Sequence, residues 1–248
     1  MNKVLLITGA SSGIGAAIAT LAAQQGYDIC INYRKSAERA ERLAAELREH
    51  KIRVITVQAD ISKEEEVLSL FNQVDNELGV LSGLVNNAGV ITPISTLNDI
   101  SAQRISDVFA INVIGTMLCS REAAKRMNTK SGGIGGSIVN VSSIAASLGS
   151  PNEFVDYAAT KGAVDTFTKG HAKEVAQFGI RVNAVRPGLI ATEMHEHAGD
   201  AERAERLKPF IPMQRIGDAV EIAETVMFLL SDAASYVTGS LVDVSGGR

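Results

Sequence analysis

The chain has 248 residues, 46 % of them hydrophobic and 21 % charged, and its formal net charge is −4. This length suits one α/β domain or two small ones, and the composition is that of a globular protein with a large core. The charge is mildly acidic and no basic patch with interleaved aromatic residues occurs, so the sequence gives no support to nucleic acid as a partner.

Strand-like and helix-like segments alternate along the chain. Apolar or alternating runs predict seven strands, over residues 4–8, 28–33, 52–58, 83–86, 137–142, 180–185 and 241–244. Helical patterns cover residues 13–25, 36–50, 62–78, 101–127, 154–178 and 218–230. This alternation predicts βαβ units and therefore a doubly wound α/β fold of the Rossmann type, with a seven-stranded parallel sheet flanked by helices. No linker or repeat is visible, so we expect a single domain over residues 1–248.

Two of the helices are expected to begin at capping boxes, in which two side chains three residues apart satisfy free backbone N–H groups. Ser62 with Glu65 would open the helix over 62–78, and Asp218 with Glu221 the helix over 218–230.

Residues 192–215 form the one irregular stretch of note. The stretch is rich in Glu, Arg and His, contains Pro209 and Pro212, and follows the strand predicted over 180–185. A polar segment at the carboxyl end of a strand is typical of a lid over a site, so we predict a lid at about 192–215.

A glycine-rich loop, Thr-Gly-Ala-Ser-Ser-Gly-Ile-Gly over residues 8–15, follows the first strand and opens the first helix. Glycines let a backbone approach a pyrophosphate, and a helix N-terminus offers free N–H groups and positive potential. Ser11 and Ser12 add hydroxyl donors. The spacing is G-x-x-x-G-x-G rather than G-x-G-x-x-G, and a tight turn without a ligand is the alternative interpretation.

The end of the second strand bears on which dinucleotide would bind. An acidic residue there would bind the ribose hydroxyls of NAD, whereas an arginine accommodates the 2′-phosphate of NADP. The sequence reads Ile-Asn-Tyr-Arg-Lys over 31–35, with no acidic residue between Asp28 and Glu38. Arg34 and Lys35 therefore favour NADP. Binding of NAD, or a merely solvated turn, remains the alternative.

The sequence indicates a cytoplasmic protein without a membrane partner. No apolar run is long enough to span a bilayer, and no signal peptide precedes the first predicted strand. Cys30 and Cys119 have no Cys-x-x-Cys partner, and we expect two buried thiols in a reducing compartment rather than a disulfide or a zinc site.

Tyr157 and Lys161 are four residues apart on a predicted helix, so both side chains would share one face. A phenol has an ordinary pKa near 10 and is a poor acid–base group at neutral pH. A nearby ammonium favours the phenolate and would lower that pKa. Ser142 or Ser143 could then hold the oxygen of an alcohol or carbonyl. The spacing alone also fits a packed tyrosine beside a solvated lysine.

The motifs together resemble the short-chain dehydrogenase/reductase family over essentially the whole chain. The segments that carry the resemblance, in the family's order, are the glycine loop, Asn86-Asn87-Ala88-Gly89, Asn112, Asn140-Val141-Ser142-Ser143, Tyr157-x-x-x-Lys161 and Arg186-Pro187-Gly188. The resemblance implies an oxidoreductase that interconverts a secondary alcohol and a carbonyl with NADP(H), similar to sugar-type or 3-oxoacyl-type members. It also implies a small-molecule substrate.

The resemblance also implies a role for each matching residue. Tyr157 would be the acid–base residue, Lys161 would lower its pKa and hydrogen-bond the nicotinamide ribose, and Ser143 would orient the substrate oxygen. Asn112 would hold a water in a proton relay.

The residues implied to bind the cofactor lie at six places along the chain. With Tyr157 and Lys161 they are Gly9, Ser11, Ser12, Gly13, Ile14, Gly15, Arg34, Asp60, Ile61, Asn87, Ala88, Gly89, Pro187, Gly188, Ile190 and Thr192. Asp60 would bind the adenine ring, residues 87–89 would lie beside the adenosine ribose, and residues 187–192 would hold the nicotinamide.

The sequence departs from the family pattern twice. The interval from Ser143 to Tyr157 is one residue longer than usual, which we assign to a loop extension near 150–153. Ser12 stands where many NADP-dependent members have an arginine, which leaves Arg34 as the main expected contact of the 2′-phosphate.

Three further interpretations complete the sequence picture. His195 and His197 lie in the predicted lid and are expected to face solvent or substrate rather than a metal. Small and apolar residues of the helix over 154–178, such as Ala163, Phe167 and Gly170, suit the helix interface that makes family members homo-oligomers, usually tetramers. A dinucleotide-binding sensor or scaffold with little catalysis is the alternative from another functional class.

Overall fold

The computed structural model describes residues 2–193 and 203–248. Its centre is a parallel sheet of seven strands, in the order β3-β2-β1-β4-β5-β6-β7. The strands are β1 (Val4–Ile7), β2 (Asp28–Tyr33), β3 (Val54–Gln58), β4 (Leu81–Asn86), β5 (Gly136–Val141), β6 (Ile180–Pro187) and β7 (Leu241–Val244). All seven predicted strands and their parallel direction are confirmed. Each predicted boundary lies within two residues of the observed one.

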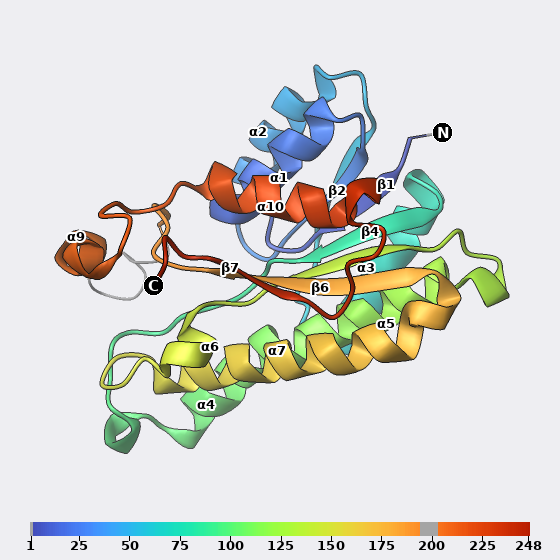
Figure 1. Ribbon diagram of the computed structural model, residues 1–248. Helices are drawn as coiled ribbons and strands as arrows, with labels where there is room; N and C mark the ends of the chain where they lie inside the picture. Colours follow the sequence, from blue (N-terminus) through green and yellow to red (C-terminus); the bar gives the residue numbers. More distant parts are fainter. Residues whose placement is uncertain (1, 194–202) are drawn as a thin grey trace.

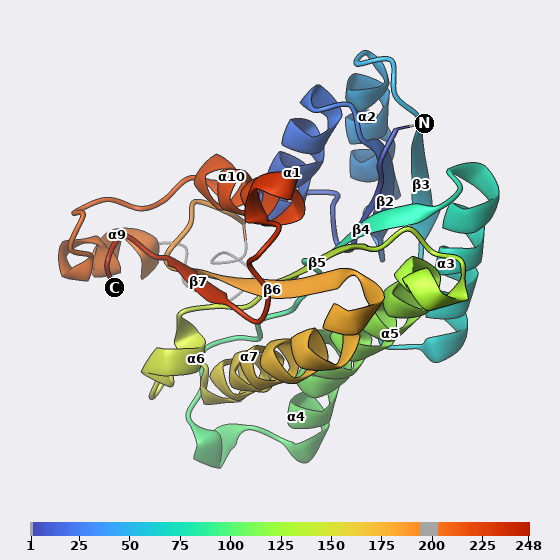
Figure 2. The same ribbon diagram turned by 45° about the vertical axis from the view of Figure 1, so that its right-hand side comes forward.

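Helices cover both faces of the sheet (Figures 1 and 2). One layer consists of α1 (Gly13–Gln24), α2 (Ala37–Arg48) and α10 (Ala219–Leu230). The other consists of α3 (Glu64–Glu77), α4 (Ala102–Phe109), α5 (Thr116–Met127) and α7 (Val155–Val175). In β1, Leu5 and Ile7 pack into the first layer, and Val4 and Leu6 into the second. Burial on both faces explains why this strand is a continuous apolar run.

The long helix predicted over 101–127 is interrupted by a wider turn. A π-helical segment, η2 (Ala110–Gly115), lies between α4 and α5 and carries Asn112. The segment lies close to the loop after β3, because a Cβ atom on Gly115 would come within 2.8 Å of the Ile61 side chain. In α4, Arg104 donates from Nε to Asp156 of α7 at 2.8 Å. These two contacts fix the rotation of α4 and of the π-helical segment about their axis, and thereby the direction in which Asn112 points.

One of the two predicted capping boxes is wrong. Helix α3 begins at Glu64, and Ser62 instead donates from its backbone N (3.0 Å) and its Oγ (2.7 Å) to the Asp60 carboxylate. Ser62 thus hydrogen-bonds Asp60, two positions earlier, and does not cap the helix. The other box is confirmed, since Asp218 donates its backbone N–H to Glu221 at 2.8 Å and α10 follows.

Two short helices were not predicted, α6 (Ala145–Leu148) and α9 (Arg203–Leu207). They are too short to show a hydrophobic period. Helix α9 lies inside the stretch predicted as a lid.

The order of the strands locates a crevice. Strand β1 is flanked by β2 and β4, so the chain leaves β1 and β4 toward opposite faces of the sheet. The loops that follow these two strands therefore separate at their carboxyl ends, which is where doubly wound folds bind ligands.

Candidate active site

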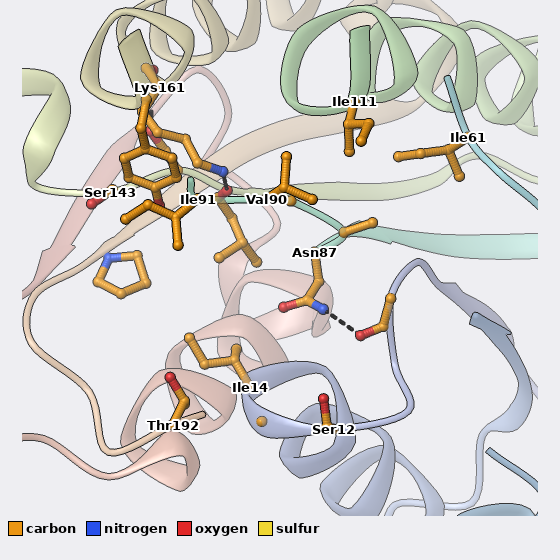
Figure 3. A pocket seen from close by; sticks show the side chains of 18 of the residues that line it. Ser12, Ile14, Ile61, Asn87, Val90, Ile91, Ile111, Ser143, Lys161 and Thr192 are labelled. Atoms are coloured by element: carbon orange, nitrogen blue, oxygen red, sulfur yellow. Dashed lines mark hydrogen bonds between the residues drawn. The ribbon is translucent and has the colours of Figure 1, made fainter. Parts of the chain in front are cut away.

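A cavity of about 430 Å³ lies at the carboxyl ends of the strands. It is elongated, with Ser12 and Asn87 toward one end and Ser143 and Lys161 toward the other (Figure 3). The predicted site residues that line it are Gly9, Ser12, Gly13, Ile14, Arg34, Asp60, Ile61, Asn87, Ala88, Gly89, Ser143, Tyr157, Lys161, Pro187, Gly188, Ile190 and Thr192. The lining described in the structure does not include Ser11, Gly15, Lys35 or Asn112.

The glycine loop is held against the turn that follows β4. Asn87 donates from Nδ2 to the carbonyl oxygens of Thr8 at 3.0 Å and Gly9 at 2.9 Å (Figure 3). Gly9 has φ +62°, and a Cβ atom there would lie 2.8 Å from the Ala88 Cα. A Cβ atom on Gly15 would lie 2.5 Å from the Asn87 Nδ2. These glycines are required because two backbone segments meet at the floor of the cavity.

Polar residues at the ends of β2 and β3 form the neighbouring wall. Asn32 accepts the backbone N–H of Gly9 at 3.3 Å and donates to the carbonyl of Ala59 at 3.1 Å. Arg34 faces Asp60, with Nη1 3.8 Å from Oδ2. Burial alone would raise the pKa of Asp60, but hydrogen bonds from Ser62 and the charge of Arg34 lower it below its ordinary value. Asp60 is therefore an anion beside a half-exposed guanidinium.

The other end of the cavity holds the side chains predicted to be catalytic. Tyr157 and Lys161 lie one turn apart on α7 and are both buried. The Nζ of Lys161 lies 5.5 Å from the centre of the Tyr157 ring and donates to the carbonyl of Val141 at 2.8 Å. The hydroxyl of Ser143 interacts with the phenol and works to lower its pKa. The structure thus brings Ser143, Tyr157 and Lys161 together.

Burial has the largest effect on the pKa values of Tyr157 and Lys161. It raises the pKa of Tyr157 to about 12, although Ser143 and the charge of Arg203 act in the opposite direction. Burial also lowers the pKa of Lys161 to about 8, which the charge of Asp165 partly offsets. The expected lowering of the Tyr157 pKa by Lys161 is not found in this structure. The reason is that removal of the phenol from water outweighs the neighbouring groups.

The two candidate serines differ in orientation. Ser142 is buried and donates from Oγ to the Lys161 carbonyl at 3.2 Å, whereas the Oγ of Ser143 accepts the backbone N–H of Ala145 at 3.1 Å and Ser143 lines the cavity with Tyr157. The predicted loop extension lies between α6 and α7. There Ser150 (φ +43°) and Asn152 (φ +62°) have left-handed backbones, which marks a tight turn, and the one-residue extension itself stays a prediction.

Asn112 is fully buried and hydrogen-bonds the backbone of Val90, a residue that lines the cavity. Its Oδ1 accepts the backbone N–H of Val90 at 2.8 Å, and its Nδ2 donates to Thr160 at 3.1 Å. A Cβ atom on Gly89 would lie 3.4 Å from the Asn112 Oδ1 and 3.5 Å from the Lys161 Nζ. Asn112 is therefore close to the catalytic end. Its water-holding role stays a prediction.

The segment after β6 approaches the glycine loop from the opposite side. A Cβ atom on Gly13 would lie 3.5 Å from the Thr192 side chain. Gly188 lies so close to β7 that a Cβ atom there would be 2.7 Å from the Ser245 Cα. The cavity thus passes between the start of α1 and the start of the predicted lid.

Several lining residues were missed by sequence reasoning, namely Asn32, Ala59, Val90, Ile91, Ile111, Val141 and Glu193, whereas Ser142, the alternative to Ser143, also lines the cavity. Most are direct chain neighbours of predicted residues, and that adjacency was an available signal. Asn32 could have been found as a polar residue that ends an apolar strand.

The predicted histidine pair, His195 and His197, lies outside the described residues. Among residues 2–193 and 203–248, no group of three or more His, Cys, Asp or Glu side chains is arranged to hold a metal ion. In the same residues, no helix is long and apolar enough to cross a membrane.

Comparison with known proteins supports these observations. The family model described as enoyl-(acyl carrier protein) reductase matches residues 9–248. The uncharacterized oxidoreductase YgfF of Escherichia coli is 50 % identical over 99 % of both chains. The 3-oxoacyl-[acyl-carrier-protein] reductase FabG of Staphylococcus aureus is 38 % identical over 100 % of this chain and 98 % of its own. A short-chain dehydrogenase of Burkholderia cenocepacia, solved in complex with NADP, is 33 % identical with a TM-score of 0.91, over 99 % of this chain and 97 % of its own.

These matches extend over nearly the whole chain and agree with the fold and with the glycine loop at the end of β1. The chain therefore belongs to the short-chain dehydrogenase/reductase family of oxidoreductases, enzymes that act on CH–OH groups.

Proposed function

We propose that the protein is an NADP(H)-dependent oxidoreductase that interconverts a secondary alcohol and a carbonyl, with Tyr157 as the acid–base residue. The observation that carries this proposal is the single cavity that joins the glycine loop and Arg34 to Ser143, Tyr157 and Lys161. A cofactor site and a proton-transfer site are thus parts of one space.

The residues of the cavity fit a nicotinamide dinucleotide. The start of α1, with the left-handed Gly9 and Gly13, offers backbone N–H groups to a pyrophosphate. A side chain at Gly89 would approach Lys161 and Asn112, so the bare backbone leaves room for a ribose. Asp60 and Ile61 would bind the adenine, and Pro187, Gly188, Ile190 and Thr192 the nicotinamide. The bound cofactor would supply or accept the hydride.

The proton would be handled by the chain itself. Because the pKa of Tyr157 is about 12, its Oη carries a proton at neutral pH and can donate it to a carbonyl oxygen held beside Ser143. In the direction of alcohol oxidation, the deprotonated phenolate form of Tyr157 would receive the proton. Lys161 would favour the phenolate when its ammonium is charged, and Asn112 would hold a water that returns the proton to solvent.

Arg34 supports NADP over NAD, since its guanidinium lines the cavity and no acidic residue lies between Asp28 and Glu38 in the sequence, where an NAD-binding acidic residue is expected. The complex of the Burkholderia relative with NADP agrees with this preference. Use of NAD is the alternative, and comparison of the two reductants decides between them.

The test is a substrate screen that follows NADPH consumption. The panel contains small ketones, sugars with a free carbonyl and a 3-oxoacyl thioester, because a relative is named for that last substrate. We expect turnover of at least one of these carbonyls. Cofactor binding without turnover anywhere on a broad panel would instead identify a sensor or scaffold.

We also propose a cytoplasmic homo-oligomer, with a tetramer as the expected state. Cys30 and Cys119 are free and buried, as suits a reducing compartment. On the α5–α7 side, Ile114 and Met117 are about half exposed, and a Cβ atom on Gly170 would meet no atom within 4 Å. Such an open apolar face suits a second copy of the chain, and analytical ultracentrifugation measures the resulting mass.

A further inference from the structure

An ion pair connects two segments that are 154 residues apart in the sequence. Arg39, in the first turn of α2, donates from Nη1 to Oε2 of Glu193 at 2.5 Å. Glu193 directly follows Thr192, in the segment that leads away from β6. The two side chains are 48 % and 50 % exposed, so the pair contributes little to the stability of the fold. Its position therefore calls for a different explanation.

The pair lies where the cofactor cavity meets a second cavity of about 410 Å³. Ser12 and Glu193 line both cavities, and Arg39 lines the second one together with Ser11. Ser12 precedes α1, and its side chain makes no hydrogen bond that caps this helix. The junction thus combines a serine hydroxyl and a guanidinium next to a helix N-terminus.

A phosphate group on the adenosine ribose would reach this junction. In a doubly wound fold the end of the second strand faces the ribose, and here Arg34 and Ser12 line the same cavity. Such a phosphate carries a charge of about −1.5 to −2. Arg34 already faces Asp60 at 3.8 Å, so its charge is shared. A second cation would help to neutralise a phosphate at this place. Lys35 lines neither cavity as described, and of Arg39 and Arg42, which both line the second cavity, Arg39 is the one that contacts Glu193 at the junction.

We propose that Arg39 is a second residue that recognises the 2′-phosphate of the cofactor, and that Glu193 is the anion it releases when that phosphate binds. The inference rests on the dinucleotide site proposed above. A phosphate carries more charge than a carboxylate and matches the planar guanidinium fork, so it displaces Glu193. A cofactor with a free 2′-hydroxyl leaves the ion pair intact. The start of the predicted lid therefore distinguishes the two cofactors.

The first test uses isothermal titration calorimetry with two fragments, adenosine 2′,5′-bisphosphate and AMP, which differ only in the 2′-phosphate. Replacing Arg39→Ala should weaken the bisphosphate about tenfold and AMP less than about twofold. Arg39→Lys keeps the charge and should recover part of the loss. An equal loss for both fragments, or no loss for the bisphosphate, overturns the proposal.

The second test uses a variant that should strengthen binding of the bisphosphate rather than weaken it. Replacing Glu193→Gln removes the competing anion, so it should strengthen bisphosphate binding about threefold and leave AMP within about twofold. In an Arg39→Ala background the same change should strengthen binding less, because only the direct repulsion between Glu193 and the phosphate is then removed. Weaker binding of the bisphosphate by Glu193→Gln would show that the ion pair supports the site, and it would refute the exchange.

A matched control is Arg215→Ala. Arg215 forms an ion pair with Glu221 at 2.5 Å with similar exposure, and neither residue lines the cofactor cavity as described. This variant should bind both fragments as the unmodified protein does. If it weakens the bisphosphate as much as Arg39→Ala does, a general surface-charge effect explains both results and the proposal fails.

The fragments carry no nicotinamide, so this outcome is independent of turnover. A protein that consumes NADPH but does not discriminate the bisphosphate from AMP retains the proposed function and loses this inference. A protein that passes both tests and reduces no carbonyl loses the proposed function alone.

Discussion

The two ends of the cavity are built from different parts of the chain. At the glycine-loop end, backbone groups of Thr8 and Gly9 are held by the amides of Asn87 and Asn32. At the catalytic end, the two side chains proposed to take part in proton transfer, Tyr157 and Lys161, are long and buried. Lys161 as a residue is 4 % exposed, and its ammonium donates to the backbone carbonyl of Val141.

The glycine-loop end therefore determines the shape of the cavity, and the catalytic end determines the protonation of the groups in it. The glycine-loop end depends on the close approach of uncharged backbone segments, so an added atom there disturbs the cavity itself. The catalytic end keeps ionisable groups out of water, which moves the pKa of Tyr157 up and that of Lys161 down. Changes at the first end should therefore affect binding and folding, and changes at the second should affect turnover.

The largest effect is expected at the catalytic end, from Tyr157→Phe. Removing the hydroxyl removes the proton donor and preserves the ring, so kcat should fall about a thousandfold. The Kd for NADPH, measured by fluorescence titration, should change less than about twofold. Tyr236→Phe is the matched control, since Tyr236 is fully exposed. Near-full activity of Tyr157→Phe would refute the mechanism.

The glycine-loop end is tested by Gly9→Ala. A Cβ atom would lie 2.8 Å from the Ala88 backbone, so we expect a loss of about 2–4 kcal/mol in the free energy of unfolding and much weaker NADPH binding. Chemical denaturation measures the first effect and titration the second. Gly26→Ala controls for backbone strain, because Gly26 also has a positive φ (+79°) with no atom within 4 Å of its Cβ position. Equal losses in both variants would mean that strain, and not the contact with Ala88, is responsible.

A smaller change should follow from Arg34→Ala. We expect the KM for NADPH to rise about tenfold and that for NADH to stay within about twofold, because only NADPH carries the 2′-phosphate. Steady-state kinetics with both reductants measures the ratio. An unchanged preference for NADPH removes Arg34 from the cofactor-selecting residues and leaves the catalytic end untouched.

The mildest perturbation is a change of pH. Lys161 has a pKa of about 8, so its ammonium is present below this pH and is lost above it, while Tyr157 stays protonated. Carbonyl reduction should therefore fall to about half at pH 8 and continue to decline above it. The pH profile of kcat measures this, and Lys161→Arg should abolish the inflection because arginine does not titrate in this range. A profile that is flat up to pH 10 contradicts the dependence on a charged Lys161.

The sequence predicted what depends on local repetition or on fixed spacing. The seven strands are visible as apolar runs, and the interval between Tyr157 and Lys161 places both on one helix face. The capping box at Ser62 failed because Asp60 competes for the same serine, which no spacing rule includes. The contact of Arg39 with Glu193 joins residues far apart in the chain, so no local pattern could indicate it. The pKa of Tyr157 depends on burial, which is likewise a property of the assembled fold.

The π-helical segment at Ala110–Gly115 limits how the chain can change in length. A π-helical turn holds about one residue more than an α-helical turn, so deleting a single residue here would convert the wide turn to an ordinary one and displace Asn112 from its place in that turn. Asn112 bonds Val90 and Thr160, and Arg104 on the preceding turns bonds Asp156, so a change in length between them would break at least one of these contacts. Insertions and deletions should therefore be tolerated in the loop at 150–153 and rejected between Arg104 and Thr116.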